Sequence, residues 1–420
     1  MSSIYILWDD AHIWGLLIKR ALESWNVDHE LVRGHQIAQG LLSGKPPAAL
    51  IVPGGWAKGK AMKLGGPGIL EIQKYVSEGG NYLGFCGGAG LGLSKTGGLG
   101  LSCWQRKGFE NRLHHFLSGH INVQLDQSSP LVPDALGENA LIPVWWPGQF
   151  SPNKCDSTAA LGRYREPGND FWVADLCISS LPEGTLNDWH NMYGISLLPE
   201  FLHDRPAVVT GNKGKGRFIL SYPHLETPAS AQANIWLSHI LDRMLGQKTQ
   251  ERPTLPAWEL TDTPLIWKDP DLVSVRNSLE KIIATGQGHF LLFWRNPWLL
   301  GWRRGIPGAA LNSLYALICK VTSHTPNDAA IEKWNSCKAD FMKYMNLFEE
   351  GVTGYLLAER FAMTMRSLEP ETFFPKALRE QRNGLFGPPP GAGGIYAKLL
   401  YMLEDLVWEM CRKEQNATEL

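Results

Sequence analysis

The sequence predicts an α/β fold in which helices cover both faces of a parallel sheet, followed by a mainly α-helical domain. Over the first 85 residues, strand and helix signals alternate at short intervals, which is typical of the βαβ units that build parallel sheets. From about residue 272 onward, most of the signals are helical. Because a chain of 420 residues is too long for one ordinary core, we expect two domains, residues 1–250 and residues 251–420.

The alternation begins at the N-terminus. Residues 3–8 (SIYILW) are typical of a buried strand, and apolar side chains from Trp14 to Trp25 then recur at the spacing of an amphipathic helix. The elements that follow are a strand at 29–32 (HELV), a short polar helix, a strand at 48–52 (AALIV), a helix marked by Ile69, Ile72 and Val76, and a strand at 81–85 (NYLGF).

Between about residues 95 and 200 the pattern is less regular and rich in Gly, Pro and Trp, with short β-like pieces at 140–146 and 170–176. Regular signals return at AVVTG and RFILSY, which flank a Gly/Lys turn and predict a hairpin. A helix over about 228–246 closes this unit, and residues 246–256 are typical of a linker.

Residues 251–420 are predicted to form an all-α domain of unknown role. The helical stretches lie near 272–285, 307–322, 327–349, 350–368 and 394–413. Trp294, Trp298 and Trp302 would share one face of a helix, although Pro297 argues for a break between them. These side chains would pack between the domains or form a surface that binds a protein partner.

Composition excludes several function classes. The chain is 44% apolar and 19% charged with a formal net charge of -1, so no general electrostatic attraction to nucleic acid or to a membrane surface is expected. No signal peptide and no run of about 20 uninterrupted apolar residues is visible. Seven cysteines without CxxC spacing fit a reducing compartment better than a disulfide framework. We therefore expect a cytoplasmic protein.

The clearest chemical signal surrounds Cys86. Gly84 and Gly88 flank it after an apolar strand, as in a nucleophile elbow, where the tight turn requires glycines. A helix starting there would favour the thiolate. His224 is the best candidate for a base, and Glu226 would orient its imidazole, because side chains two apart in an extended segment point the same way.

Each of these residues also has an ordinary structural explanation. Cys86 would be a small buried residue in a glycine-rich loop, His224 a turn residue after Pro223, and Glu226 a carboxylate near a helix start. Their joint occurrence favours a site. Backbone N–H groups at Gly55, which ends a strand, and at Gly87 would then stabilise an oxyanion.

Other candidate residues surround this site. Asp9, Asp10 and Gly54 would line a pocket at the same sheet edge, although the two aspartates are better explained as caps of the helix near residue 11. Cys103, His114, His115 and His120 match no common zinc spacing, so we expect no metal. Residues 211–217 miss the register of a phosphate loop, and residues 88–101 miss that of a dinucleotide site, so we expect no cofactor.

Three motifs, PGG at 53–55, GFCGGAG at 84–90 and GKGRFILSYPHLE at 214–226, resemble the class I glutamine amidotransferase-like superfamily. The most similar branch is named for the N-terminal domain of biotin–protein ligase. The resemblance spans roughly residues 1–246 and implies a flavodoxin-like fold. It also implies a catalytic triad of Cys86, His224 and Glu226, with Gly55 and Gly87 at the oxyanion-hole positions.

This chain departs from the family at one informative position. Gly90 stands where glutaminases of this class usually carry a Gln, and no Gly/Arg-rich biotinyl-adenylate loop is present. The resemblance therefore implies a cysteine-dependent amide hydrolase or amidotransferase-like acyl-transfer enzyme other than a standard glutaminase. Its substrate would be a small molecule with an amide or acyl group. The alternative is a non-catalytic binding or regulatory module whose helical domain binds a protein partner.

Overall fold

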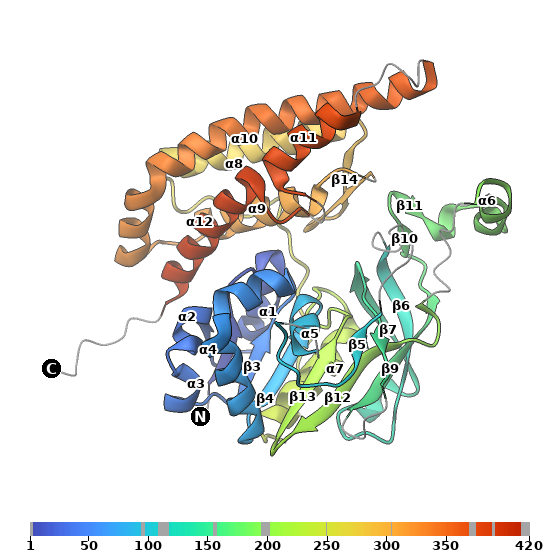
Figure 1. The fold of residues 1–420 in the computed structure, drawn as a ribbon, viewed down its shortest axis with the longest axis vertical. Helices are drawn as coiled ribbons and strands as arrows, with labels where there is room; N and C mark the ends of the chain where they lie inside the picture. Colours follow the sequence, from blue (N-terminus) through green and yellow to red (C-terminus); the bar gives the residue numbers. More distant parts are fainter. Residues whose placement is uncertain are drawn as a thin grey trace. The chain divides into compact units, whose positions relative to one another are not determined.

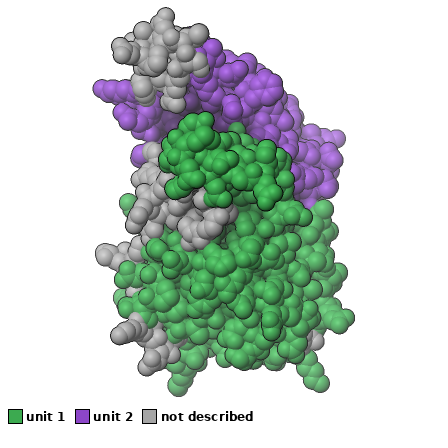
Figure 2. All heavy atoms as spheres, turned by 90° about the vertical axis from the view of Figure 1, so that its right-hand side faces the viewer, with its two compact units in different colours: residues 1–257 green, residues 258–420 purple. Residues whose placement is uncertain are grey.

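The computed structural model describes residues 3–93, 97–107, 117–153, 158–194, 202–248, 250–303, 305–368, 375–388 and 391–412. The chain divides into two compact units, Met1–Ala257 and Trp258–Leu420, coloured separately in Figure 2. The division lies at the end of the segment that was expected to be a linker. The candidate site lies in the first unit.

A parallel sheet forms the centre of the first unit (Figure 1). Its strands are, in spatial order, β2 (His29–Val32), β1 (Ile4–Leu7), β3 (Ala49–Val52), β4 (Asn81–Phe85) and β13 (Gly216–Ser221). The predicted fold class is confirmed. These parallel strands end at one edge of the sheet, where open α/β sheets place their ligands.

The sheet continues beyond β13 as an antiparallel extension. Its elements are β12 (Pro206–Lys213), β9 (Thr158–Pro167), β6 (Leu117–Leu125), β10 (Trp172–Val173) and β11 (Leu176–Cys177), with β7 (Asn139–Trp145) beside β6 and α6 (Thr185–Tyr193) after β11. The hairpin of β12 and β13 was predicted. The β-like pieces expected at 140–146 and 170–176 are β7 and the pair of β10 and β11. Strands β6 and β9 were not predicted, because register shifts interrupt the pairing of β9 with both neighbours and blur the alternation of side chains.

Helices cover both faces of the sheet, as expected. One face carries α1 (His12–Ser24) and α7 (Ala231–Met244), and the other carries α2 (Gly34–Ala38), α3 (Leu41–Gly44), α4 (Ala57–Ser77) and α5 (Gly87–Gly92). Successive side chains of a strand point to opposite faces. Ile4 and Ile6 of β1 therefore enter the core under α1 and α7, while Tyr5 and Leu7 enter the second core.

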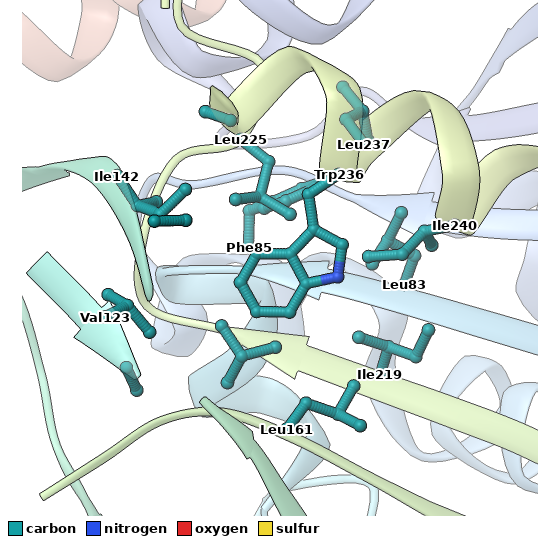
Figure 3. Packing of buried hydrophobic residues seen from close by; sticks show 14 of the residues in the cluster. Leu83, Phe85, Val123, Ile142, Leu161, Ile219, Leu225, Trp236, Leu237 and Ile240 are labelled. Carbon is teal, nitrogen blue, oxygen red and sulfur yellow. The ribbon is translucent and has the colours of Figure 1, made fainter. Parts of the chain in front are cut away.

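Trp236 of α7 joins the parallel and antiparallel parts of the sheet. Figure 3 shows its indole among Leu83 and Ile219 from parallel strands and Val123 and Leu161 from antiparallel strands. The side chain is fully buried, and its Nε1 donates to the Leu131 carbonyl at 2.9 Å. Both parts of the sheet thus share one core.

The second unit is mainly α-helical. Its helices are α8 (Pro270–Gly288), α9 (Gly308–Thr322), α10 (Asp328–Leu368), α11 (Pro375–Phe386) and α12 (Gly394–Cys411). The two helices expected at 327–349 and 350–368 are one helix of 41 residues. Gly351 does not interrupt α10. Because Gly351 has no side chain, Leu385 of α11 can pack against the helix backbone, and a Cβ on Gly351 would lie 2.7 Å from Leu385 Cδ2.

The expectation of an all-α segment is wrong at one place. β14 (Leu292–Asn296) and β15 (Leu299–Trp302) form a hairpin, so Trp294, Trp298 and Trp302 share no helical face. The Asn296 side chain accepts hydrogen bonds from the N–H groups of Trp298 and Leu299 at 3.2 and 2.8 Å, which fixes the turn around Pro297. Trp298 is buried within the second unit and stacks on Trp258 at 6.4 Å between ring centroids.

The sequence also predicted reduced cysteines. Cys103 is disulfide-bonded, so the expectation of reduced thiols is wrong there; the other described cysteines, Cys86, Cys177, Cys319, Cys337 and Cys411, are free.

No cluster of possible metal ligands occurs within the described ranges. His114 and His115 lie outside those ranges, and His120 binds Asp170 at 2.8 Å. None of the described helices is long and apolar enough to cross a membrane.

Candidate active site

Cys86 occupies a strained turn between β4 and α5. Its backbone angles are φ 45° and ψ -102°, and a positive φ is uncommon for a residue with a Cβ. The Cys86 N–H donates to the Ser221 carbonyl at 2.7 Å, and its carbonyl accepts from the Gly90 N–H at 2.9 Å. These bonds fasten the turn to β13 on one side and to the new helix on the other. The geometry is that of the predicted elbow.

Glycines allow the elbow to pack directly on the end of β3. A Cβ on Gly87 would lie 2.0 Å from the Gly55 carbonyl oxygen, and one on Gly88 would lie 1.9 Å from the Val52 carbonyl oxygen. No side chain fits at either position. The structure thus brings Gly55 and Gly87 together, and the oxyanion hole at their N–H groups stays a prediction.

His224 and Glu226 form a fully buried pair just beyond β13. His224 Nδ1 and Glu226 Oε1 are 2.7 Å apart, and neither residue is exposed. The His224 N–H donates to the Pro143 carbonyl at 3.0 Å, and Thr227 Oγ1 donates to the His224 carbonyl at 2.7 Å. These bonds hold the segment in place. Within the described part of the chain, His224 Nε2 has no hydrogen-bond partner of standard geometry.

The thiol and the imidazole stabilise each other's charged forms. Burial alone lowers the pKa of His224, but the negative charge of Glu226 and the interactions with Cys86 outweigh it and raise that pKa to about 9. Burial likewise raises the pKa of Cys86, but the close contact with His224 and the charges of His224 and Arg106 bring it below its ordinary value. The pair therefore favours a thiolate beside an imidazolium.

Trp14 is a site residue that the sequence did not reveal. Its ring lies 4.3 Å from the His224 ring and 5.7 Å from that of Trp146, measured between centroids. A Cβ on Gly54 would lie 2.7 Å from Trp14 Cγ, so the indole fills the space between this glycine and the imidazole. In the sequence, Trp14 belongs to the apolar stripe of α1 and carries no further signal.

Asp9 and Asp10 have different surroundings. Asp9 accepts a hydrogen bond from the Gly34 N–H at the start of α2 and pairs with Arg33 at 3.4 Å. The expectation that the two aspartates cap α1 is wrong, because no side chain caps the N-terminus of that helix. Asp10 is buried, has φ 49°, and directs its carbonyl at Gly55, where a Cβ would lie 1.9 Å away. Asp10 thus lies beside the candidate oxyanion hole.

Three further polar residues of the first unit had not been predicted as site residues, and two of them, Tyr222 and Arg106, interact electrostatically with the thiol. Tyr222 lies two positions before His224, Gln149 is buried next to Phe150, and Arg106 lies in the short strand β5 (Gln105–Arg106), which pairs with β8 (Phe150–Ser151). The intervening segments are long and irregular, so no spacing in the sequence links these residues to Cys86.

Comparison with known proteins agrees with the motifs around the elbow. Residues 43–96 match the family model described as "Biotin-protein ligase, N terminal", a segment that includes both the PGG turn and Cys86. Over these residues, the predicted resemblance to the branch named for the N-terminal domain of biotin–protein ligase is confirmed. A search of curated proteins finds no match to the chain.

Solved structures similar to the chain include the following three. A protein described as a GMP synthase component from Thermoplasma acidophilum is 13% identical, with 59% of this chain and 93% of that chain covered and a TM-score of 0.36. A glutamine amidotransferase from Thermotoga maritima is 9% identical, with 58% and 99% covered and a TM-score of 0.33. A β-galactosidase from Bacillus circulans sp. alkalophilus is 11% identical, with 60% and 32% covered and a TM-score of 0.34.

Proposed function

We propose that the first unit is a cysteine-dependent amide hydrolase or amidotransferase-like acyl-transfer enzyme with Cys86, His224 and Glu226 as its triad. The observation that carries this proposal is the buried 2.7 Å pair of His224 and Glu226 next to a thiol on a strained elbow. A nucleophile, a base and a group that orients the base are the parts that acyl transfer needs.

The proposed reaction proceeds through a thioester. The Cys86 thiolate attacks the amide carbonyl carbon, and the new C–S bond pushes an electron pair onto the oxygen, which the N–H groups of Gly55 and Gly87 stabilise. His224 then gives its proton to the leaving nitrogen as the C–N bond breaks. Water, or an acceptor amine, attacks the thioester and loses a proton to His224, and the thiolate leaves.

The alternative proposal is a non-catalytic binding or regulatory module built on the same fold, with a protein partner at the second unit. Gly90 favours it, since glutaminases of this class usually carry a Gln at that position. A site of this kind would bind its ligand at Cys86 without forming a thioester. The two proposals therefore differ in whether an amide acylates the thiol.

Alkylation of Cys86 as a function of pH tests the activated nucleophile. Iodoacetamide labelling, followed peptide by peptide by mass spectrometry, should show Cys86 titrating below the ordinary thiol value of 9.0, because its pKa is lowered. In His224→Ala that titration should move upward. Cys177, a free thiol in β11, serves as the control within the same sample.

Turnover is the second readout. Ammonia release from a panel of small amides, with Cys86→Ser as the blank, tests hydrolysis directly. A Cys86 titration that ignores His224→Ala would contradict the activated nucleophile. A low thiol pKa without acylation by any amide would instead favour the binding module.

A further inference from the structure

A chain of hydrogen bonds outside the Cys86 triad joins an aspartate, a histidine and a serine. His120 lies in β6, Asp170 lies in the turn between β9 and β10, and Ser230 directly precedes α7. His120 Nδ1 is 2.8 Å from Asp170 Oδ2, and His120 Nε2 is 3.1 Å from Ser230 Oγ. Carboxylate, imidazole and hydroxyl thus follow one another as in serine hydrolases, whose triads are recognised by geometry and not by position in the sequence.

The hydrogen-bond partners of His120 determine where its proton lies. An ionised carboxylate only accepts hydrogen bonds, so Asp170 favours the tautomer of His120 with the proton on Nδ1. Asp170 Oδ1 also accepts the backbone N–H of His120 at 2.9 Å, which fixes the carboxylate beside the ring. Nε2 is then an acceptor, and the Ser230 hydroxyl donates to it. The imidazole is therefore oriented as a base toward the serine oxygen.

Two glycines allow the turn that carries Asp170 to pack directly on β6. A Cβ on Gly119 would lie 2.5 Å from the Asp170 carbonyl oxygen, and one on Gly168 would lie 2.9 Å from the His120 carbonyl oxygen. Gly119 also has φ 128°, a conformation that residues with a Cβ rarely adopt. The Gly168 N–H donates to the His120 carbonyl at 2.8 Å. The backbone therefore holds the carboxylate next to the histidine.

Ser230 follows a strained residue at the start of α7. Ala229 has φ 56°, which is uncommon for a residue with a Cβ, and its N–H donates to the Leu255 carbonyl at 2.9 Å. A serine before a helix usually caps it, but the Ser230 side chain makes no capping bond. Its hydroxyl is bonded to His120 instead. The N–H groups in the first turn of α7 have no partner within the helix, so they are suited to stabilise a developing oxyanion.

The three residues extend from the protein surface to a buried hydroxyl. The side chains of Asp170 and His120 are 50% and 24% exposed, whereas Ser230 is 4% exposed. A substrate would reach Ser230 Oγ along the imidazole, and the burial of the serine restricts the reaction to a small acyl group such as acetyl.

We propose that Ser230, His120 and Asp170 form a second catalytic site that hydrolyses small esters. Ser230 Oγ attacks the ester carbonyl carbon and gives its proton to His120 Nε2, while the C=O electron pair moves onto the oxygen. The C–O bond then breaks, and the alcohol leaves with that proton. Water attacks the acyl-serine and loses a proton to His120, which returns it to Ser230 Oγ as the acid is released. Asp170 orients the imidazole, and no step involves Cys86.

Sulfonylation of Ser230 tests whether its hydroxyl is activated. Methanesulfonyl fluoride is small enough for a buried serine, and Cys86→Ala removes the competing thiol. Peptide mass spectrometry should then find label on Ser230 and none on Ser128, an exposed serine whose hydroxyl donates to Asp126 at 2.6 Å. His120→Ala and Asp170→Asn should each slow the labelling of Ser230 by about tenfold or more.

His203→Ala is the matched control, because it removes another histidine that lies near a carboxylate, with Nδ1 3.6 Å from Glu166 Oε1. It should leave the labelling of Ser230 unchanged. Labelling of Ser230 that is no faster than that of Ser128, or that survives both His120→Ala and Asp170→Asn, would overturn the site.

Ester turnover tests the reaction itself. Hydrolysis of p-nitrophenyl acetate is measured in Cys86→Ala and in the same variant with Ser230→Ala. The serine substitution removes no helix cap and should lower the rate by about tenfold or more. Equal rates in the two variants would reject the second site. Because Cys86 is absent from both, neither result depends on the function proposed for the thiol.

Discussion

The charge on the His224 imidazole results from two opposing effects at a single residue. Burial removes water that would solvate an imidazolium, whereas the carboxylate at 2.7 Å and the adjacent thiol stabilise it. The electrostatic interactions prevail and raise the pKa to about 9. The same interactions give the thiol its lowered pKa, so both residues are charged over one shared range of pH.

The pH profile of turnover should reflect this pair. His224 is protonated only below its raised pKa, and the leaving nitrogen needs that proton. The rate should therefore fall as the pH rises through about 9. On the acid side, the rate should fall as the pH drops through the lowered pKa of Cys86, because the thiolate is lost. A pH series of kcat/KM on an accepted amide measures both limbs.

Glu226→Gln tests the cause of the alkaline limb. Removing the carboxylate charge should move that limb to lower pH, since this charge raises the pKa of His224. Glu166→Gln is the control, because it removes the carboxylate charge from an exposed histidine–glutamate pair in which Glu166 Oε1 lies 3.6 Å from His203 Nδ1. An alkaline limb that stays at the same pH in Glu226→Gln would show that Glu226 does not set it.

Tyr222 and Tyr164 should respond differently to loss of the hydroxyl. Tyr222→Phe removes a buried hydroxyl that has no partner among the described residues, so the free energy of unfolding should stay the same or rise. Tyr164→Phe removes the hydrogen bond to Gly148 and should cost about 1 kcal/mol. Urea denaturation of both variants measures the difference. Destabilisation by Tyr222→Phe would mean that its hydroxyl already has a hydrogen-bond partner in the folded chain.

At the scale of elements, the β4–α5 turn depends on the end of β3. The turn approaches β3 so closely that backbone atoms alone fill the space, as the distances at Gly87 and Gly88 show. The position of Cys86 is therefore set by strand β3 as much as by its own strand. This close packing explains why a glycine-rich segment forms an ordered helix despite the low helix propensity of glycine.

Two alanine substitutions in α5 should have opposite effects. Gly88→Ala places a Cβ 1.9 Å from the Val52 carbonyl oxygen and should destabilise the first unit by about 3 kcal/mol or more. In Gly90→Ala the new Cβ lies 3.6 Å from Ala57 Cβ, an ordinary contact, so the variant should be neutral or up to about 1 kcal/mol more stable. Equal stabilities of the two variants, measured by urea denaturation, would contradict this packing.

At the scale of the whole molecule, Trp236 connects the two parts of the large sheet. Because its indole packs against strands of both parts and fills one continuous core, we expect them to unfold together. Trp236→Ala should cost about 3–5 kcal/mol, whereas Leu70→Ala, at a side chain that is 65% exposed, should change little. Loss of the antiparallel strands alone, seen by hydrogen exchange in Trp236→Ala, would contradict a shared core.

The sequence could predict the elements whose signals are local. The apolar strands β1, β3 and β4, the hairpin of β12 and β13, and most helices of the second unit follow from the period of apolar side chains and from turn residues. Strands β6 and β9 could not be predicted, although they have 9 and 10 residues, because register shifts in their pairing disturb the alternation of side chains. The β14–β15 hairpin was missed because four-residue tryptophan spacing fits a helix equally well.

For the site, the sequence by itself determined the chemistry available: a cysteine between glycines, a histidine with a glutamate two residues on, and a glycine turn at the end of a strand. Only the tertiary structure decided what surrounds them. Trp14, which lies against the imidazole, and Arg106, whose charge lowers the pKa of the thiol, come from segments with no common spacing. The local sequence determines which functional groups are present, but the burial and the charge of each group depend on neighbours that only folding brings together.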